Sequence, residues 1–527
     1  MSETPLHKYS LLLFTAMGFA LRLFYLFQPV RYDEAFTYLT FASQPLTKGL
    51  SFWMQQNNHP LNTLFVHVLS KGLANQPWIW RLPDFVAGVL LVPLVYILAR
   101  KLYNRNAALI AAALMVPASI LIDFSTQARG YSLQAFMSGV LVLIVIRLLK
   151  KDTVWGWIGF VFVTVLGFYE IATFLYFFPV ALAFFAIQAW RKENRRTLYL
   201  KCALYTVAAA AITVGLYLPF AIKSGLRNLL SAAESLPWHS FLSTMPAKLK
   251  EIGAGFSIRV PLGISLLVLL GFLIAVVMNR RVSKYKVGLP LIFLVWFFVF
   301  SFVQRVIPVP RILIPFFLVY LAAASAGLYY LGSVLAGFLQ KERGNSGRKP
   351  LRASPVVGAV LLVLLVVVLT VYVVVAAAPY QKSEIGKVDI STFTDAPKVT
   401  TFLKNRLKPG DLAVGNADFS SAELQYYFEK DGVPTALLYP LFPTPDRPSW
   451  QKLGYRSDLN KLKRLFLVSD TRDVEAGSIE SPVTVARKAG VDINDFRKVR
   501  TVYKTPSTVI EEWVRVKEAA GGSGTLR

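Results

Sequence analysis

Acidic residues are scarce over most of this chain. Its 527 residues include 30 Asp or Glu against 57 Lys or Arg, and only 11 of the acidic residues lie among the first 378, where 34 basic residues stand. A water-exposed surface in that region would need more carboxylates. Cysteine is scarcer still: with Cys202 alone, no disulfide can form within the chain.

The sequence also lacks the motifs of several enzyme classes. It has no GxGxxG, no Walker motif, no CxxC and no HExxH. Dinucleotide, nucleotide-triphosphate, dithiol and zinc-hydrolase chemistry therefore have no support. No internal repeat is found either, whereas many secondary transporters consist of two matching halves.

Apolar sequence is what the chain has in abundance, at 55% of its residues. Apolar stretches of about 18 residues recur through the first two thirds, and each can cross a hydrocarbon core of roughly 30 Å. We therefore predict a polytopic α-helical membrane protein with eleven spans. They are expected near residues 10–29, 80–99, 107–122, 131–149, 155–169, 170–189, 202–222, 261–279, 288–304, 311–333 and 355–378.

The net charge of +27 does not indicate a nucleic-acid partner. Of the 34 basic residues before position 378, 21 lie in the N-terminus and in alternate short loops, which is the positive-inside pattern of cytoplasmic loops. The groups are Arg100 to Arg105, Arg147 to Lys151, Arg191 to Lys201, Arg280 to Lys286 and Lys341 to Arg352. The prediction is a multi-pass protein of the cell (inner or plasma) membrane, with a cytoplasmic N-terminus and an external C-terminal segment.

Two domains are expected, a membrane module at 1–378 and an extracytoplasmic α/β domain at 379–520. The first outer loop, 30–79, is long, and its pattern predicts two interfacial amphipathic helices near 34–43 and 60–74. The C-terminal segment alternates helix and strand, as an α/β domain does. The elements are a helix at 398–407, a strand at 411–415, a helix at 422–430 and a strand at 464–469. The Gly- and Ser-rich tail 521–527 resembles a linker or tag remnant.

Asp33 and Glu34 follow the first span, in the run Arg31-Tyr32-Asp33-Glu34-Ala35-Phe36. Two interpretations are open. Asp is a good helix N-cap and Glu suits a first turn, so the pair can simply stabilise the helix that follows. Alternatively, one carboxylate is a general base with a neighbour that orients it, or the two hold a divalent metal ion.

Other polar residues stand at the outer ends of predicted spans. His59 precedes a proline at a helix start and is either a surface histidine or a hydrogen-bond donor to a phosphate or sugar. Arg129, with Gln127 and Tyr131, begins one span, and Arg311 begins another. Each arginine either reaches along the lipid interface or holds an anion.

Glu170 lies between two apolar runs, where a carboxylate is costly unless it is paired or faces water. We weigh a functional role for it slightly ahead of a structural one, and interpret Asp84, Asp123 and His67 as structural. Carboxylates and arginines on one face suit transfer from a phosphate-activated donor: a base removes the acceptor proton, and arginines stabilise the departing phosphate. Without a nucleotide motif, a donor carried by a membrane lipid fits best.

Five segments together resemble a known family. They are Tyr32-Asp33-Glu34-Ala35, Asn58-His59-Pro60-Leu61, Trp80-Arg81-Leu82-Pro83, Gln127-Ala128-Arg129-Gly130-Tyr131-Ser132 and Pro310-Arg311-Ile312-Leu313-Ile314-Pro315. In order and spacing they are similar to GT-C-fold glycosyltransferases of the protein O-mannosyltransferase and aminoarabinose-transferase group, glycosyltransferase family 39. The resemblance covers most of residues 10–335.

The resemblance implies transfer of a sugar from a polyprenyl-phosphate donor to an external acceptor, a protein, lipid or glycan, normally with inversion. It implies Asp33 as base, Glu34 as the second acidic residue, and Arg129 and Arg311 as ligands of the lipid phosphate. The chain departs from the family pattern twice: it has His59-Pro60-Leu61 where relatives have a second acidic or His-Pro-Pro motif, and Glu170 where many have a histidine.

Two rival functions use the same features. A transporter or flippase for lipids or lipid-linked sugars is expected to carry charges or broken helices near the midplane, whereas the candidate residues here gather at one face. A non-catalytic scaffold whose external domain binds a partner or a cell-wall glycan is compatible with the sequence.

Overall fold

The computed structural model describes most of the chain. The described residues are 4–54, 57–230, 235–257, 259–342, 355–377, 393–416, 419–441, 461–470, 480–506 and 508–516. The tail 521–527 and most of the basic group Lys341 to Arg352 lie outside them. The chain forms two compact units, which are taken in turn below. The first comprises Met1–Phe27, His59–Phe65 and Trp80–Ala378, and the second comprises Gln28–Asn58, Val66–Ile79 and Pro379–Arg527.

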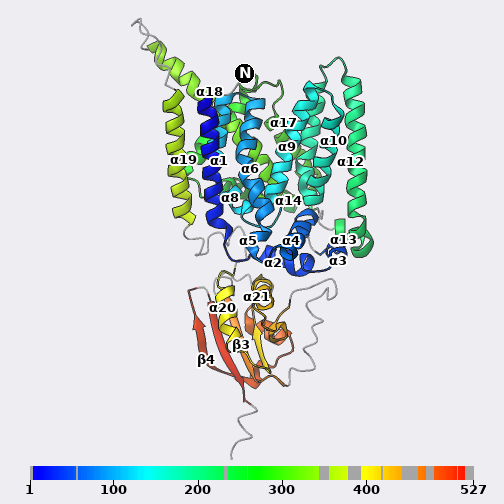
Figure 1. Cartoon of the computed structure of the whole chain (residues 1–527), viewed down its shortest axis with the longest axis vertical. Helices are drawn as coiled ribbons and strands as arrows, with labels where there is room; N and C mark the ends of the chain where they lie inside the picture. The colour runs from blue at the N-terminus through cyan, green and yellow to red at the C-terminus, as the bar shows by residue number, and fades with distance from the viewer. Residues whose placement is uncertain are drawn as a thin grey trace, which may run out of the picture. The chain divides into compact units, whose positions relative to one another are not determined.

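The first unit is a helical membrane domain (Figure 1). Within the described residues, seven segments are long and apolar enough to span a membrane, or eight if the bent pair α7 and α8 counts as one span. The seven contain α1 (Pro5–Leu26), α6 (Leu82–Leu102), α9 (Tyr131–Lys150), η2 (Ala172–Tyr176) with α11 (Phe178–Ala189), α12 (Arg195–Ser224), η4 (Pro310–Leu313) with α18 (Ile314–Glu342), and α19 (Pro355–Ala377).

The remaining expected spans are also helical. α7 (Arg105–Met115) and α8 (Ser119–Ser125) meet at an angle of 63° over residues 107–122. The shorter apolar helices α10 (Val154–Glu170), α15 (Leu262–Val277) and α17 (Leu289–Gln304) occupy the other three. The predicted polytopic helical fold is therefore confirmed.

Close backbone contact holds two of these helices together. A Cβ atom on Gly327 of α18 would lie 1.8 Å from the carbonyl oxygen of Gly271 on α15. Only glycine lets the two helix backbones come this close. Close packing of this kind holds helices together in a membrane, where the hydrophobic effect does not drive them to associate. Ala322, Ala323 and Ala326 on α18 are fully buried as well, so this helix is central to the unit.

Three helices of the first unit were not expected: α13 (Leu226–Leu230), α14 (Trp238–Phe256) and α16 (Asn279–Val282). The loop 223–260 contains α13 and α14. α14 carries Lys248 and Glu251 on its exposed surface and buries Phe241, so it is amphipathic and too polar to be recognised as a span. The short helix α16 joins α15 to α17.

The second unit combines most of the first loop with the C-terminal domain. The loop contains α2 (Tyr32–Thr37), the π-helix η1 (Tyr38–Ala42) and α3 (Leu46–Gly49). α4 (Pro60–Gly72) and α5 (Pro77–Trp80) follow, and both contribute residues to each unit. The two expected loop helices thus correspond to α2 with η1 and to α4, and the short helices α3 and α5 are additional.

A mixed five-stranded sheet forms the C-terminal part of the second unit (Figure 1). Its strands are β1 (Asp411–Val414), β2 (Leu438–Tyr439), β3 (Arg464–Asp470), β4 (Phe496–Lys504) and β5 (Thr508–Arg515), in the order β2-β1-β3-β5-β4. β1 is parallel to β2 and β3, and β5 is antiparallel to β3 and β4. The helices are α20 (Ala396–Lys404), α21 (Phe419–Lys430) and α23 (Pro482–Lys488), with the 3-10 turns η7 (Thr435–Leu437) and η11 (Ile493–Asp495).

The packing of this sheet confirms the predicted α/β character. Leu412, Leu465 and Leu467 share one core with Val485 of α23. Each of the four expected elements is present, as α20, β1, α21 and β3. The sequence interpretation missed β4, whose exposed side chains give no alternation of apolar and polar residues, and its partner β5.

Candidate active site

The acidic pair lies on α2 in the second unit. The Oε2 atom of Glu34 accepts a hydrogen bond from the backbone amide of Arg31 at 3.0 Å, and Glu34 is 1% exposed. Its carboxylate therefore closes the first turn of its own helix, as a glutamate at the third helical position does. Asp33 is partly exposed. Of the two carboxylates, Asp33 is the one with access to solvent.

In the first unit, His59 holds the short polar loop 126–130, between α8 and α9. Its Nδ1 atom lies 2.7 Å from the carbonyl oxygen of Arg129. Because a carbonyl only accepts, Nδ1 carries the proton and Nε2 is left as an acceptor. Nδ2 of Asn62 donates to the carbonyl of Ala128, also at 2.7 Å. The start of α4 thus fixes the backbone on which Arg129 stands.

Asp84 fixes the same loop from α6. Its carboxylate accepts hydrogen bonds from the backbone amides of Gly130 at 2.8 Å, Ser132 at 3.2 Å and Leu133 at 3.4 Å. Asp84 is fully buried. These amides belong to the first turn of α9, where a carboxylate satisfies donors that the helix leaves open. This is a structural role, as the sequence indicated for Asp84.

Glu170 ends α10 and lies against the same loop. It is fully buried, and its Oε1 atom lies 3.8 Å from Nδ1 of His59. Gly130 has φ +69°, and a Cβ atom there would lie 1.6 Å from Oε1 of Glu170. The positive charge of Arg129 acts on this carboxylate. A glycine at 130 is what lets this carboxylate approach the loop.

Four of the predicted residues therefore meet in the first unit. His59, Arg129 and Glu170 are 3%, 3% and 0% exposed. The ring of Tyr131 packs edge-on against His59, with centroids 5.4 Å apart. We call His59, Arg129, Tyr131 and Glu170 the loop cluster. Gln127 lies in the same loop and is 2% exposed.

The charge of Arg311 reaches this cluster from η4. Burial, then the positive charges of Arg129 and Arg311, lowers the pKa of His59 well below its usual value, against the opposing effect of the bond to the Arg129 carbonyl. His59 is therefore neutral at neutral pH. Since its one N–H is used by the backbone, a substrate contact by His59 would be made through Nε2 as an acceptor.

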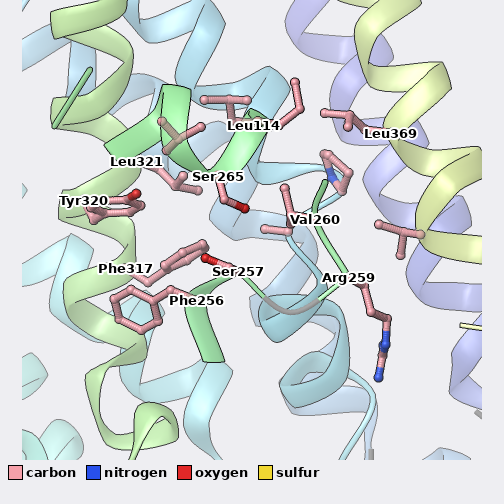
Figure 2. A pocket seen from close by; sticks show the side chains of 15 residues that line it. Leu114, Phe256, Ser257, Arg259, Val260, Ser265, Phe317, Tyr320, Leu321 and Leu369 are labelled. Atoms are coloured by element: carbon pink, nitrogen blue, oxygen red, sulfur yellow. The ribbon is translucent and has the colours of Figure 1, made fainter. Parts of the chain in front are cut away.

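A pocket that the sequence did not indicate lies elsewhere in the first unit (Figure 2). It has a cavity volume of about 50 Å³ and lies between α7, α15, α18 and α19. Figure 2 shows Phe256, Phe317 and Tyr320 on one side of it and Arg259 on the other. Arg259 has φ +54°, and its Nη1 lies 3.3 Å from Oδ1 of Asp123.

Arg259 carries the same signal that singled out the other two arginines. It stands two residues before the span expected at 261–279, as Arg129 and Arg311 stand at the starts of theirs. Asp123, interpreted as structural from the sequence, is its ion-pair partner. No cluster of three or more His, Cys, Asp or Glu that would suit a metal ion occurs among the described residues.

The loop cluster lies inside a segment of the chain that matches a known protein family. Residues 58–217 match the family model of dolichyl-phosphate-mannose-protein mannosyltransferases. No match was found among curated proteins. The segment contains all members of the loop cluster together with Asp84 and Gln127, and the expected resemblance is confirmed.

Solved structures of the same fold cover nearly the whole chain. ArnT from Cupriavidus metallidurans bound to undecaprenyl phosphate matches with a TM-score of 0.57 and 12% identity, over 95% of this chain and 97% of that one. Its apo form gives a TM-score of 0.56 and 13% identity over the same shares. The oligosaccharyltransferase AglB from Archaeoglobus fulgidus, in complex with an inhibitory peptide and a dolichol-phosphate, matches with 0.52 and 13%, over 96% and 74%.

These likenesses show the GT-C fold, and the family match shows that residues 58–217 are similar to a family of membrane mannosyltransferases. The predicted multi-span membrane fold is confirmed.

Proposed function

We propose that this protein transfers a sugar from a polyprenyl-phosphate-linked donor to an acceptor outside the cytoplasm, with inversion at the anomeric carbon. The observation that carries the proposal is the buried loop cluster within the family-matching segment 58–217. Support for a lipid-phosphate donor comes from two structures of the same fold, one bound to undecaprenyl phosphate and the other to a dolichol-phosphate.

In this proposal the cationic residues of the first unit bind the donor. The main chain at Arg129 is held in place, because Asp84, His59 and Asn62 all hydrogen-bond its loop. A fixed guanidinium is worth more to a developing phosphate charge than a mobile one, since no reorganisation is needed when the charge appears. Arg311 adds a second positive charge.

Asp33 is the proposed base. It removes the proton from the acceptor hydroxyl while that oxygen attacks the anomeric carbon, and the bond from this carbon to the phosphate oxygen breaks. Polyprenyl phosphate leaves with the negative charge, and the proton stays on Asp33. A single displacement inverts the configuration. The half-buried position of Asp33 and the use of Glu34 as a helix cap support this division of roles.

We also propose the topology that the charges favour: a cytoplasmic N-terminus, an external domain at 379–520, a membrane module at 1–378, and residence in the cell (inner or plasma) membrane. The acceptor class is a protein, a lipid or a glycan.

The direct test uses the purified full-length protein with a panel of polyprenyl-phosphate sugars and membrane lipids, followed by mass spectrometry. A mass shift of one sugar on an acceptor is expected, with release of polyprenyl phosphate. Counterflow of a lipid-linked sugar across liposomes, without any transfer product, would instead establish a flippase.

A further inference from the structure

The second unit ties the helix that carries Asp33 to the C-terminal domain. The backbone amide of Val30 donates a hydrogen bond to the hydroxyl of Tyr427 on α21, at 3.0 Å. Val30 and Asp33 are three positions apart, whereas Val30 and Tyr427 are 397 apart. Val30 is fully buried. This bond therefore fixes the main chain immediately before α2 begins.

A second set of contacts holds the other end of α2. The ring of Tyr426 packs edge-on against Tyr38, the first residue after α2, with centroids 5.6 Å apart. Nδ2 of Asn75 donates to the hydroxyl of Tyr38 at 2.8 Å, and Lys430 donates to Gln76 at 3.0 Å. Tyr426 is fully buried. Two consecutive tyrosines of α21 thus reach the two ends of α2.

α2 depends on such external contacts because it is short. Together with η1, which continues it without a break, it has 11 residues (32–42), fewer than the roughly 12–15 that an isolated helix needs to be stable in water. Its own cap, from Glu34 to the Arg31 amide, closes one turn only. The surface on which α2 lies therefore determines where the partly exposed side chain of Asp33 points.

We infer that Tyr427 and Tyr426 are positioning residues for Asp33, and that the C-terminal domain takes part in catalysis by orienting this base. The inference rests on the proposed function, in which Asp33 removes the acceptor proton. A base works only within hydrogen-bond reach of its proton, and a displacement of about 1 Å can cost up to ~10²-fold in rate. Loss of the Tyr427 hydroxyl removes the tie to Val30 while the ring keeps its packing.

The experiment compares full-length wild type with Tyr427→Phe. We expect kcat to fall about tenfold with the KM for the lipid-linked donor unchanged, because the base is displaced while donor binding is not. Amide hydrogen exchange over residues 28–37 should become faster. The matched control is Tyr503→Phe, on β4, where the ring packs on Phe402. It should leave both kcat and that exchange rate as in the wild type.

Asp33→Asn in the same assay separates the two ideas. If Asp33→Asn keeps wild-type turnover, the proposed base is wrong. If it is inactive while Tyr427→Phe retains wild-type kcat and exchange, the positioning inference alone is overturned. Should Tyr427→Phe fail to accumulate, Tyr426→Leu, which removes the ring contact with Tyr38, must show the same fall in kcat at constant donor KM.

Discussion

Glu170 and Gly130 lie against each other so closely that a methyl group on the glycine would stand 1.6 Å from the carboxylate oxygen. The two residues come from different helices, α10 and the start of α9. Asp84 accepts a hydrogen bond from the amide of Gly130. The loop that carries Arg129 is thus clamped by two buried carboxylates, one satisfied by backbone amides and one beside the arginine.

This clamp predicts a specific cost for Gly130→Ala. Alanine at φ +69° is strained by about 1–2 kcal/mol, as any L-residue is there, and its Cβ must also displace Glu170. Gly432 is the matched control, because it has the same φ of +69° with open space where a Cβ would stand. Gly432→Ala should lower stability by the strain alone, and Gly130→Ala by clearly more. Melting curves in detergent check this, and equal losses would contradict the clamp.

His59 predicts how stability depends on pH. Burial lowers its pKa in the folded protein below the unfolded value of about 6.5. Below that pH the imidazole of the unfolded chain binds a proton, whereas the buried imidazole of the folded protein stays neutral. The contribution of His59 to the free energy of unfolding is therefore complete above pH ~6.5. It is lost as the pH falls, by up to about 1.4 kcal/mol per pH unit.

The variant His59→Gln should flatten this dependence between pH 5 and 7, because glutamine can still donate to the Arg129 carbonyl and does not titrate. His239→Gln, at an exposed position at the start of α14, is the control and should keep the wild-type slope. Melting temperatures across the range measure it. If the melting temperature of His59→Gln falls with pH as steeply as that of the wild type, another group causes the loss of stability at acid pH.

The spans could be predicted because each is a local pattern. Apolar runs fix the helices of the first unit, and α/β alternation fixes α20, β1, α21 and β3 without any tertiary information. The exposed strand β4 has no such local signature: its pairing with β5 decides its structure, and pairing is a non-local property.

The candidate site was predictable only in part, for the same reason. Each member of the loop cluster could be singled out by its type at a span end, but nothing local says that His59, Arg129 and Glu170 meet. Arg259 also stands just before a predicted span, as the other arginines do. It was missed because it lies in a long loop that also contains the amphipathic helix α14. The link from α2 to Tyr427 joins residues nearly 400 positions apart, beyond the reach of any pattern.

Arg129 and Arg311 should contribute to donor binding more than to acceptor binding. Replacing either with alanine removes a charge-assisted contact worth about 1.5–3 kcal/mol, so the KM for the lipid-linked donor should rise at least tenfold while the acceptor KM stays within twofold. Arg227→Ala, on the exposed surface of α13, is the control. Initial rates with each substrate varied in turn decide the matter. If acceptor binding suffers instead, the arginines do not hold the phosphate.

Asp33→Asn should reduce turnover by about 10²–10⁴-fold, the usual contribution of a general base, with little change in melting temperature because Asp33 is only partly buried. Glu34→Gln should behave differently. A glutamine oxygen can still accept from the Arg31 amide, as in a capping box, so its activity should stay within a few-fold of wild type. Single-turnover rates with both variants distinguish the carboxylates. If Glu34→Gln loses activity and Asp33→Asn retains it, the proposed assignment is wrong. The base would then be Glu34, the buried residue that also closes the helix.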